Sequence, residues 1–466
     1  MTDMLLRLRR LDDLLVRCMR CGMCQAVCPI YIETRRETMV ARGKLALLEA
    51  LAMVMLDDAK GVKERLDTCL LCGSCQAACP SGVRVLDIFL EARAILGAYL
   101  GLPPLKKAVI RLLLGRPWLM DRLVPLAAWG QRLVCRPARR SVALGPASGK
   151  DETRGEAPAG VPPVTGSVGE SGPAALRSSC ALLTSPLLQG RCVAPLARVP
   201  FRREMGSIAE PAGTAGITVA FFFGCMVDAM YPRVGHAVLD ILRRYGVGIE
   251  MPEGQVCCGI PALASGDRQA FDRLVELNAR VFENLTFDYL VTACASCTST
   301  MALHWPGKYG GRDTTARAFA ERLEPRVMDI SAFLVDVLGV TSSPTTAPEA
   351  SPGPDAVAVT YHDPCHLKKS LGVSTQPRAL LRASPGVRFV EMADADHCCG
   401  CGGSFTLDHY DLSRRIGQRK RAAIVASGAR VVATSCPACM MQLTDALAQA
   451  GDDVAVRHVV EVFNAR

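Results

Sequence analysis

The chain has 466 residues, of which 50% are hydrophobic, and a formal net charge of +9 at pH 7. This length exceeds what one hydrophobic core usually supports and predicts about three domains. No stretch reaches the roughly eighteen uncharged apolar residues that a membrane-spanning helix needs, and charged residues interrupt the N-terminus where a secretion signal would be apolar. The 22 cysteines therefore predict a reducing, cytoplasmic environment rather than a set of disulfides.

Two cysteine runs of identical spacing, C-x2-C-x2-C-x3-C-P, mark the N-terminal part of the chain. In two-cluster ferredoxins with this pattern, three thiolates of a run bind one iron–sulfur cluster and the fourth binds the other. We therefore predict two [4Fe–4S] clusters, the first on Cys18, Cys21, Cys24 and Cys79 and the second on Cys69, Cys72, Cys75 and Cys28. Zinc, the alternative, usually requires two CxxC pairs.

The segment between the two runs, which includes ARGKLALLEALAMVML, has helical periodicity. Residues 1–100 are therefore predicted to form an α-helical ferredoxin-type domain. Residues 101–139 follow as a basic amphipathic helical segment, in which Pro117 and Pro125 are expected to break the helix. Such a segment suits a helix packed on its own protein, or a contact with another subunit or an anionic membrane surface. The net charge does not favour nucleic acid as a partner, because cluster-bound thiolates would cancel much of it.

Residues 140–214 are predicted to be a low-complexity linker or insertion, because Gly, Pro, Ala and Ser dominate them. The C-terminal half is an internal repeat of residues 215–340 and 357–466, joined by a proline-rich linker over 341–356. ITVAFFFGC, VCCG and YLVTACASC in the first copy correspond to VAVTYHDPC, HCCG and RVVATSCPAC in the second. Strands that alternate with helices predict a parallel α/β sheet in each copy.

Five cysteines in each copy fall at the ends of predicted strands, where the loops of a parallel sheet converge. They are Cys225, Cys257, Cys258, Cys294 and Cys297 in the first copy and Cys365, Cys398, Cys399, Cys436 and Cys439 in the second. We predict one metal site in each copy, which could hold an iron–sulfur cluster or zinc, with buried structural cysteine as the remaining alternative. His362, His366 and His397 flank the second set and are interpreted as core histidines or hydrogen-bonding neighbours with satisfied partners.

The doubled cysteine-rich (CCG) repeat behind a two-cluster ferredoxin domain resembles the iron–sulfur subunits of glycolate oxidase. It is also similar to those of D-lactate dehydrogenase, anaerobic glycerol-3-phosphate dehydrogenase and heterodisulfide reductase. The segment ARGKLAL, with Arg42 and Gly43, resembles glycolate oxidase subunits most. Cys294 and Cys297 complete the first repeat as in heterodisulfide reductases, whose five cysteines hold non-cubane clusters, and this likeness implies that both copies bind clusters.

The resemblance implies an electron-transfer subunit of a flavin-dependent 2-hydroxy-acid dehydrogenase. The chain has no flavin or nicotinamide motif and no catalytic side chain of its own is predicted, so a partner FAD-containing subunit would oxidise glycolate, D-lactate or a related acid. Electrons would then pass through the clusters toward a quinone or a membrane cytochrome, with the chain cytoplasmic or peripheral on the inner membrane. Two alternatives stay open: a heterodisulfide-reductase-like subunit that reduces a disulfide at the CCG-bound clusters, and CCG repeats that hold zinc and only bind a partner.

Overall fold

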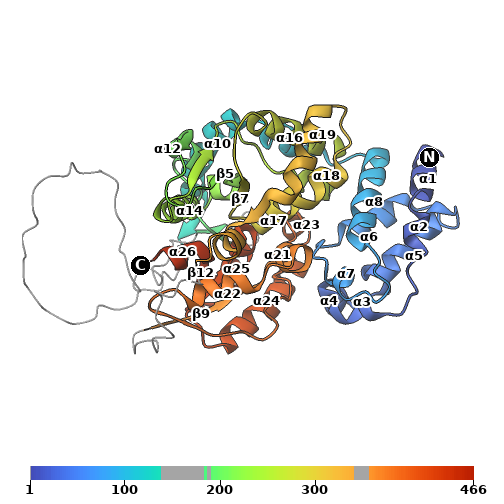
Figure 1. Cartoon of the computed structure of the whole chain (residues 1–466). Helices are drawn as coiled ribbons and strands as arrows, with labels where there is room; N and C mark the ends of the chain where they lie inside the picture. The colour runs from blue at the N-terminus through green and yellow to red at the C-terminus, as the bar shows by residue number, and fades with distance from the viewer. Residues whose placement is uncertain (1, 138–182, 186–189, 341–355, 466) are drawn as a thin grey trace, which may run out of the picture.

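The computed structural model describes residues 2–137, 183–185, 190–340 and 356–465. An α-helical N-terminal domain lies beside two α/β domains, which pack against each other (Figure 1). Within the described residues, no helix combines the length and the apolar character needed to cross a bilayer.

Helices alone build the N-terminal domain, as predicted. The elements are α1 (Thr2–Arg9), α2 (Asp12–Leu15), α3 (Met23–Val27), α4 (Pro29–Thr34), η1 (Glu37–Met39), α5 (Ala41–Ala52), α6 (Ala59–Asp67), α7 (Ser74–Ala77) and α8 (Val85–Leu100). The apolar faces of α5 and α8 are buried against α1 and α6. Most of the cysteines of the two runs lie in loops and short helical turns, so their side chains are not committed to this helical core.

The basic segment is helical, with α9 (Pro104–Ala108), the π-helical turn η2 (Val109–Leu113) and α10 (Pro117–Val134). Pro117 begins α10, where its missing N–H would have no intrahelical partner. Pro125 lies inside α10, so the expectation that it breaks the helix was wrong.

Part of the predicted linker is ordered. Residues 138–182 and 186–189 lie outside the described residues, whereas residues 190–214 of the predicted linker or insertion contain regular secondary structure. The elements formed by the described part of this region are β1 (Arg136–Pro137), β2 (Leu183–Ser185), β3 (Arg191–Val193), α12 (Phe201–Met205) and β4 (Ile208–Glu210). The fully buried ring of Phe201 packs edge-on against Phe221 and Phe223, and this aromatic anchor gives the region a core that its composition concealed.

The two α/β domains share one topology. The first sheet has the order β4-β6-β5-β7-β8 with only β4 antiparallel, and the second has the order β10-β9-β11-β12 with all pairs parallel. Their strands are β5 (Thr218–Phe222), β6 (Gly248–Met251), β7 (Tyr289–Thr292), β8 (Val327–Asp329), β9 (Val357–Tyr361), β10 (Val387–Phe389), β11 (Val431–Thr434) and β12 (Ala455–His458). Apart from β4, each sheet runs second strand, first, third, fourth, which agrees with an internal repeat.

Helices cover both sheets. Those of the first domain are α13 (Gly224–Ala229), α14 (Pro232–Arg244), α15 (Ile260–Ser265), α16 (Arg268–Phe282), α17 (Ala295–Ser299), η4 (Thr300–His304), α18 (Trp305–Lys308), α19 (Thr314–Leu323), η5 (Glu324–Arg326), α20 (Ile330–Ala332) and η6 (Phe333–Val337). Those of the second are α21 (Cys365–Leu371), α22 (Thr375–Arg382), α23 (Phe405–Asp408), α24 (Tyr410–Ala426), α25 (Pro437–Ala450) and α26 (Val459–Asn464).

The two α/β domains pack with approximate two-fold symmetry. The helix that follows the first cysteine turn of each copy lies against the helix of the CxxC turn of the other, so α13 contacts α25 and α17 contacts α21. The backbone N–H of Ala295 donates to the carbonyl of Ser435 at 3.0 Å across this interface. The cysteine-bearing ends of both sheets therefore face each other.

The N-terminal domain contacts both α/β domains. Arg93 of α8 donates to the carbonyl of Ala264 at 2.7 Å, and Glu33 of α4 pairs with Arg419 of α24 at 2.9 Å. The first of these contacts is close enough to exclude a side chain at Gly266, where a Cβ atom would lie 2.3 Å from the carbonyl oxygen of Arg93. The fold thus depends on a glycine at this junction.

Gly266→Ala tests this dependence, with Gly372→Ala as a matched control. Both glycines end a helix in the left-handed conformation, with φ of +80° and +73°, but nothing lies within 4 Å of a Cβ atom at Gly372. We expect the control to lose about 1 kcal/mol of stability from backbone strain alone. Gly266→Ala should lose at least about twice as much, seen as a larger drop in Tm. Equal losses would show that the junction adapts.

Candidate metal centres

The structure gathers the ferredoxin cysteines into two small hollows. The first is lined by Cys18, Cys21, Cys24, Cys75 and Cys79, and the second by Cys28, Cys69, Cys72 and Cys75. Each hollow thus contains one complete predicted ligand set, including the fourth cysteine from the other run. Cys75 borders both hollows, so the two sites are neighbours. The assignment of individual ligands stays a prediction.

Two buried basic side chains, Lys44 and Arg93, lie beside the second hollow. Lys44 donates from Nζ to the carbonyl of Thr68 at 2.7 Å, and burial lowers its pKa. Arg93 donates to the carbonyls of Leu66 and Cys69 at 2.5 and 2.8 Å. Positive charge held here would stabilise a negatively charged cluster with its thiolates.

In each CCG repeat a glycine allows the Cys-Cys turn to form. Gly259 and Gly400 have φ of +98° and +90°, and a Cβ atom would lie 2.8 Å from the ring of Phe271 or 2.6 Å from the carbonyl oxygen of Ser413. In the first repeat Trp305 also fixes the turn, because its indole N–H donates to the carbonyl of Cys258 at 2.9 Å. These contacts hold the paired thiols at the ends of the strands.

The ten CCG cysteines line one shared cavity of about 280 Å³, so the two predicted metal sites would adjoin each other. Cys72 of the ferredoxin domain and the additional Cys401 also line it. Within this cavity the pKa of each thiol is shifted by the next, in the unbroken order Cys72, Cys365, Cys398, Cys399, Cys439, Cys436, Cys294, Cys297, Cys258, Cys257 and Cys225. We call this set the sulfur line.

The chemistry of these donors fits bound metal. Hydrogen bonds with neighbouring thiols, together with burial, raise the pKa values of Cys257, Cys297 and Cys439 well above the usual range. Burial raises the pKa of Cys28 to about 12. Such thiols stay protonated at neutral pH unless a cation stabilises the thiolate, and iron or zinc does so directly.

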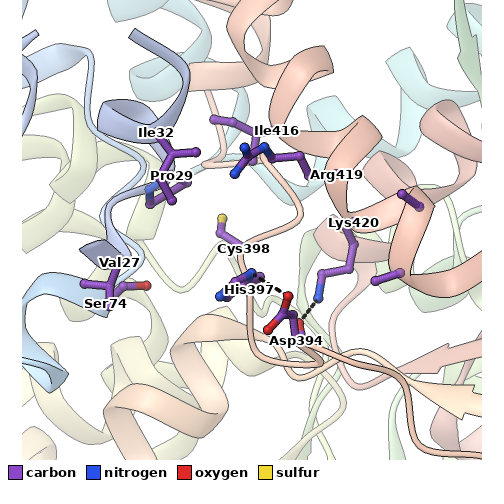
Figure 2. A pocket seen from close by; sticks show the side chains of 12 residues that line it. Val27, Pro29, Ile32, Ser74, Asp394, His397, Cys398, Ile416, Arg419 and Lys420 are labelled. Atoms are coloured by element: carbon purple, nitrogen blue, oxygen red, sulfur yellow. Dashed lines mark hydrogen bonds and ion pairs between the residues drawn. The ribbon is translucent and has the colours of Figure 1, made fainter. Parts of the chain in front are cut away.

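A further hollow, of about 360 Å³, lies between the ferredoxin domain and α24 (Figure 2). Pro29 and Ile32 face Ile416 and Arg419 across it, and the sulfur of Cys398 lies between them. The buried Lys420 extends toward the loop that precedes Cys398, where its Nζ donates to the carbonyls of Asp394 and Ala395 at 2.5 and 3.2 Å. The second CCG repeat is thus open to a small cavity from its ferredoxin side.

The sequence analysis did not identify Lys369, which connects the second ferredoxin site to the second CCG repeat. Its Nζ donates to Ser74 Oγ of the ferredoxin domain at 2.6 Å and to the carbonyl of Asp396 at 2.9 Å. Burial opposes its charge, but Cys365 and Cys72 outweigh burial and raise its pKa. A lysine on a short helix resembles any solvated lysine in sequence, so no local signal identified it.

The three flanking histidines differ in their surroundings. His366 lies 3.0 Å from Ser296 Oγ through Nδ1, and His397 is exposed beside Asp394. His362 is completely buried, and within the described residues neither of its ring nitrogens has a hydrogen-bond partner. His362 nevertheless lowers the pKa of Cys399, after Cys398 and Cys439, so its interpretation as a hydrogen-bonding neighbour or core histidine stays a prediction.

Comparisons with known proteins agree with this architecture. The cysteine-rich domain family matches residues 219–302 and 359–444, and the 4Fe-4S dicluster domain family matches residues 15–83. The chain is 31% identical over 246 residues to "Lactate utilization protein A" of an Exiguobacterium species, covering 96% of that protein and 53% of this chain. This chain belongs to the cysteine-rich CCG-domain family of iron–sulfur proteins. The ferredoxin domain of this family member accordingly holds two [4Fe–4S] clusters.

Two further relatives extend the comparison. The "Probable glycolate oxidase iron-sulfur subunit" of Bacillus subtilis is 29% identical over 459 residues, which cover 96% of this chain and 92% of that protein. A subunit of the CoM/CoB fumarate reductase of Methanothermobacter marburgensis is 35% identical over 260 residues, which cover 56% of this chain. The match spans 48%, about half, of the length of that fumarate reductase protein.

Replacing Lys369 with Met should lower the reduction potential of the neighbouring centres, because its positive charge stabilises their reduced, more negative forms. Coulomb's law at a partly buried site gives about 1 kcal/mol, or roughly 40 mV for a one-electron couple. A redox titration followed by electron paramagnetic resonance (EPR) measures the shift. Lys368→Met is the control, since Lys368 points to Asp363 at 3.4 Å and Arg378 also pairs with that carboxylate. Equal shifts in both variants would assign the effect to overall charge.

Proposed function

We propose that this chain is the electron-transfer subunit of a flavin-dependent 2-hydroxy-acid dehydrogenase and carries single electrons from an FAD-containing subunit toward a membrane acceptor. The observation that supports this most is the sulfur line, because it joins the ferredoxin domain to both CCG repeats without a gap. Iron–sulfur clusters on these cysteines would supply one-electron carriers. The names of the glycolate oxidase and lactate utilization relatives point to the substrate class.

We place the entry of electrons at the first ferredoxin site. Cys21 is exposed there, and the exposed Met19 and Met23 line the same hollow, with the exposed Val16 nearby in the sequence. An apolar, Met-rich surface beside an accessible cluster site suits the docking of a partner subunit. The flavoprotein would thus meet the chain at the end farthest along the sequence from the CCG repeats.

We place the exit at the first CCG repeat, which ends the sulfur line. Cys225 and Cys257 line a small hollow together with Leu113, Leu114 and Pro117, and the N–H of Cys257 donates to the carbonyl of Leu114 at 3.3 Å. The part of the basic segment that contains η2 and the start of α10 therefore covers this end of the line. An acceptor that approaches α10 would come close to the last thiols.

Cys21→Ser tests the proposed route in the complex isolated from the host. Glycolate or D-lactate should still reduce the partner's flavin, whereas turnover with a quinone should fall to background and one cluster signal should disappear from the EPR spectrum. Cys135→Ser is the control, because Cys135 is buried outside the sulfur line and should leave turnover unchanged. Normal quinone turnover in Cys21→Ser despite the lost cluster would sink the route.

The shared cavity supports one other function, the reduction of a disulfide. Both sets of CCG cysteines face one cavity of about 280 Å³, which could admit a thiol or disulfide group to two metal sites at once. If thiols change the EPR spectrum of the isolated complex and 2-hydroxy acids do not, this second function replaces the first.

We further propose that α10 contacts an anionic lipid surface. Trp118, Leu126, Trp129 and Leu133 form an exposed stripe at helical spacing along α10, with Trp129 66% exposed. Arg122 lies within the stripe over the ring of Trp118, at 5.7 Å. Tryptophan and leucine flanked by arginine are typical of helices that lie in a membrane interface.

Vesicle sedimentation tests this contact. The protein should bind phosphatidylglycerol vesicles more strongly than phosphatidylcholine vesicles, and Trp118→Ser with Trp129→Ser should weaken binding about tenfold through lost apolar burial, about 1.4 kcal/mol or more. Leu407→Ser, which changes an exposed leucine on α23, should have no effect. Failure of the unaltered protein to bind anionic vesicles would contradict the proposal.

A further inference from the structure

The two CCG repeats differ at one buried position next to their cysteines. When the copies are aligned on Cys225 and Cys365, His362 occupies the position of Phe222. Phe222 is buried at the end of β5 and packs against Phe282, with ring centroids 6.3 Å apart. The second copy thus has an imidazole where the first has a hydrocarbon ring.

The side chain of His362 is 0% exposed, and neither ring nitrogen meets hydrogen-bond geometry among the described residues. Its polar neighbour is a thiol, because His362, after Cys398 and Cys439, lowers the pKa of Cys399. The backbone N–H of His362 donates to the carbonyl of Ala433 at 2.8 Å, which fixes the residue at the end of the sheet. A buried imidazole held at a fixed position beside thiols is placed to share a metal ion with them.

Two thiols lie close enough to His362 to bind the same metal ion. A ring nitrogen of His362, Cys399 Sγ and Cys439 Sγ all lie within 4.8 Å of one another, and all three residues are buried. Imidazole nitrogen and thiolate are ligands that iron and zinc share. Cys436 interacts with Cys439 and extends this group.

We infer that His362 is a metal ligand of the second CCG repeat, which therefore binds iron through nitrogen and sulfur, whereas the first repeat binds through sulfur alone. A neutral imidazole in place of a thiolate leaves the iron centre less negative, and this raises its reduction potential. The second repeat is the one whose cysteines interact with a ferredoxin cysteine, through Cys72 with Cys365 and Cys398. The consequence for electron flow rests on the proposed function, but the ligand itself does not.

The experiment uses the full chain, purified without oxygen and reduced with dithionite, so that it needs no donor subunit. Pulsed EPR on protein with 15N-labelled histidine should detect a directly bound histidine nitrogen in the unaltered protein. His362→Phe, which installs the residue of the first copy, should abolish this coupling. His362→Cys should lower the potential of one centre. His397→Phe, which changes an exposed histidine beside Cys398, should leave both properties unchanged.

Three results would overturn the inference. They are the absence of a bound histidine nitrogen in iron-loaded unaltered protein, its persistence in His362→Phe, and zinc in place of iron at the second repeat by metal analysis. Because the labelled, unaltered protein gives its own answer, misfolding of a variant does not remove the test. A bound histidine together with no response to any 2-hydroxy acid would support the ligand and reject only the proposed function.

Discussion

Sulfur atoms packed against one another in a protein interior set the main constraint on this structure. Thiolates that lie close together in a protein interior repel one another and have lost their hydration, so cations must stabilise them. Bound metal would supply most of that charge, and the protein adds Lys44, Arg93, Lys369 and Lys420. Two of these also fasten domains together, because Lys369 binds Ser74 and Arg93 binds the carbonyl of Ala264. Lys369 and Arg93 therefore both place positive charge near the cysteines and hold domains together.

The approximate two-fold packing of the CCG repeats turns two local sites into one continuous region. Three strand-end turns converge at each sheet, as in other parallel α/β folds. Because α13 lies against α25 and α17 against α21, the two sets of turns meet face to face. Cys436 and Cys294 carry the line across, with Ser296 Oγ 3.8 Å from Cys436 Sγ. Symmetry of the backbone does not impose symmetry of the chemistry, since Phe222 and His362 occupy equivalent places.

Local spacing explains what could be predicted from the sequence. The cysteines of each ferredoxin run lie within one short stretch of chain, and the strand-cysteine-helix pattern of the CCG repeats is likewise local. The ferredoxin motif, the repeat and the parallel sheets were therefore all predictable. The shared cavity was not, because it depends on which faces of two domains meet. The order around Phe201 was hidden by the low-complexity composition before it. His362 could have been found by aligning the copies, since a polar residue that follows a buried strand at the position of Phe222 is a conflict that needs a partner.

The position of the ferredoxin domain distinguishes the two repeats. Its Cys72 interacts with thiols of the second repeat, whereas its polar contacts with the first are made by Arg93, Glu91 and Asp87 and involve no cysteine side chain. The first repeat is therefore connected to the ferredoxin sites through the second, and its own thiols lie under η2 and α10. In the proposed route, an electron that enters at Cys21 would pass the nitrogen-ligated centre before it reaches the all-sulfur one. A higher reduction potential at the second repeat would hold an electron there until an acceptor arrives at α10. The centre of the first repeat, at the end of the route, would then stay oxidised between turnovers.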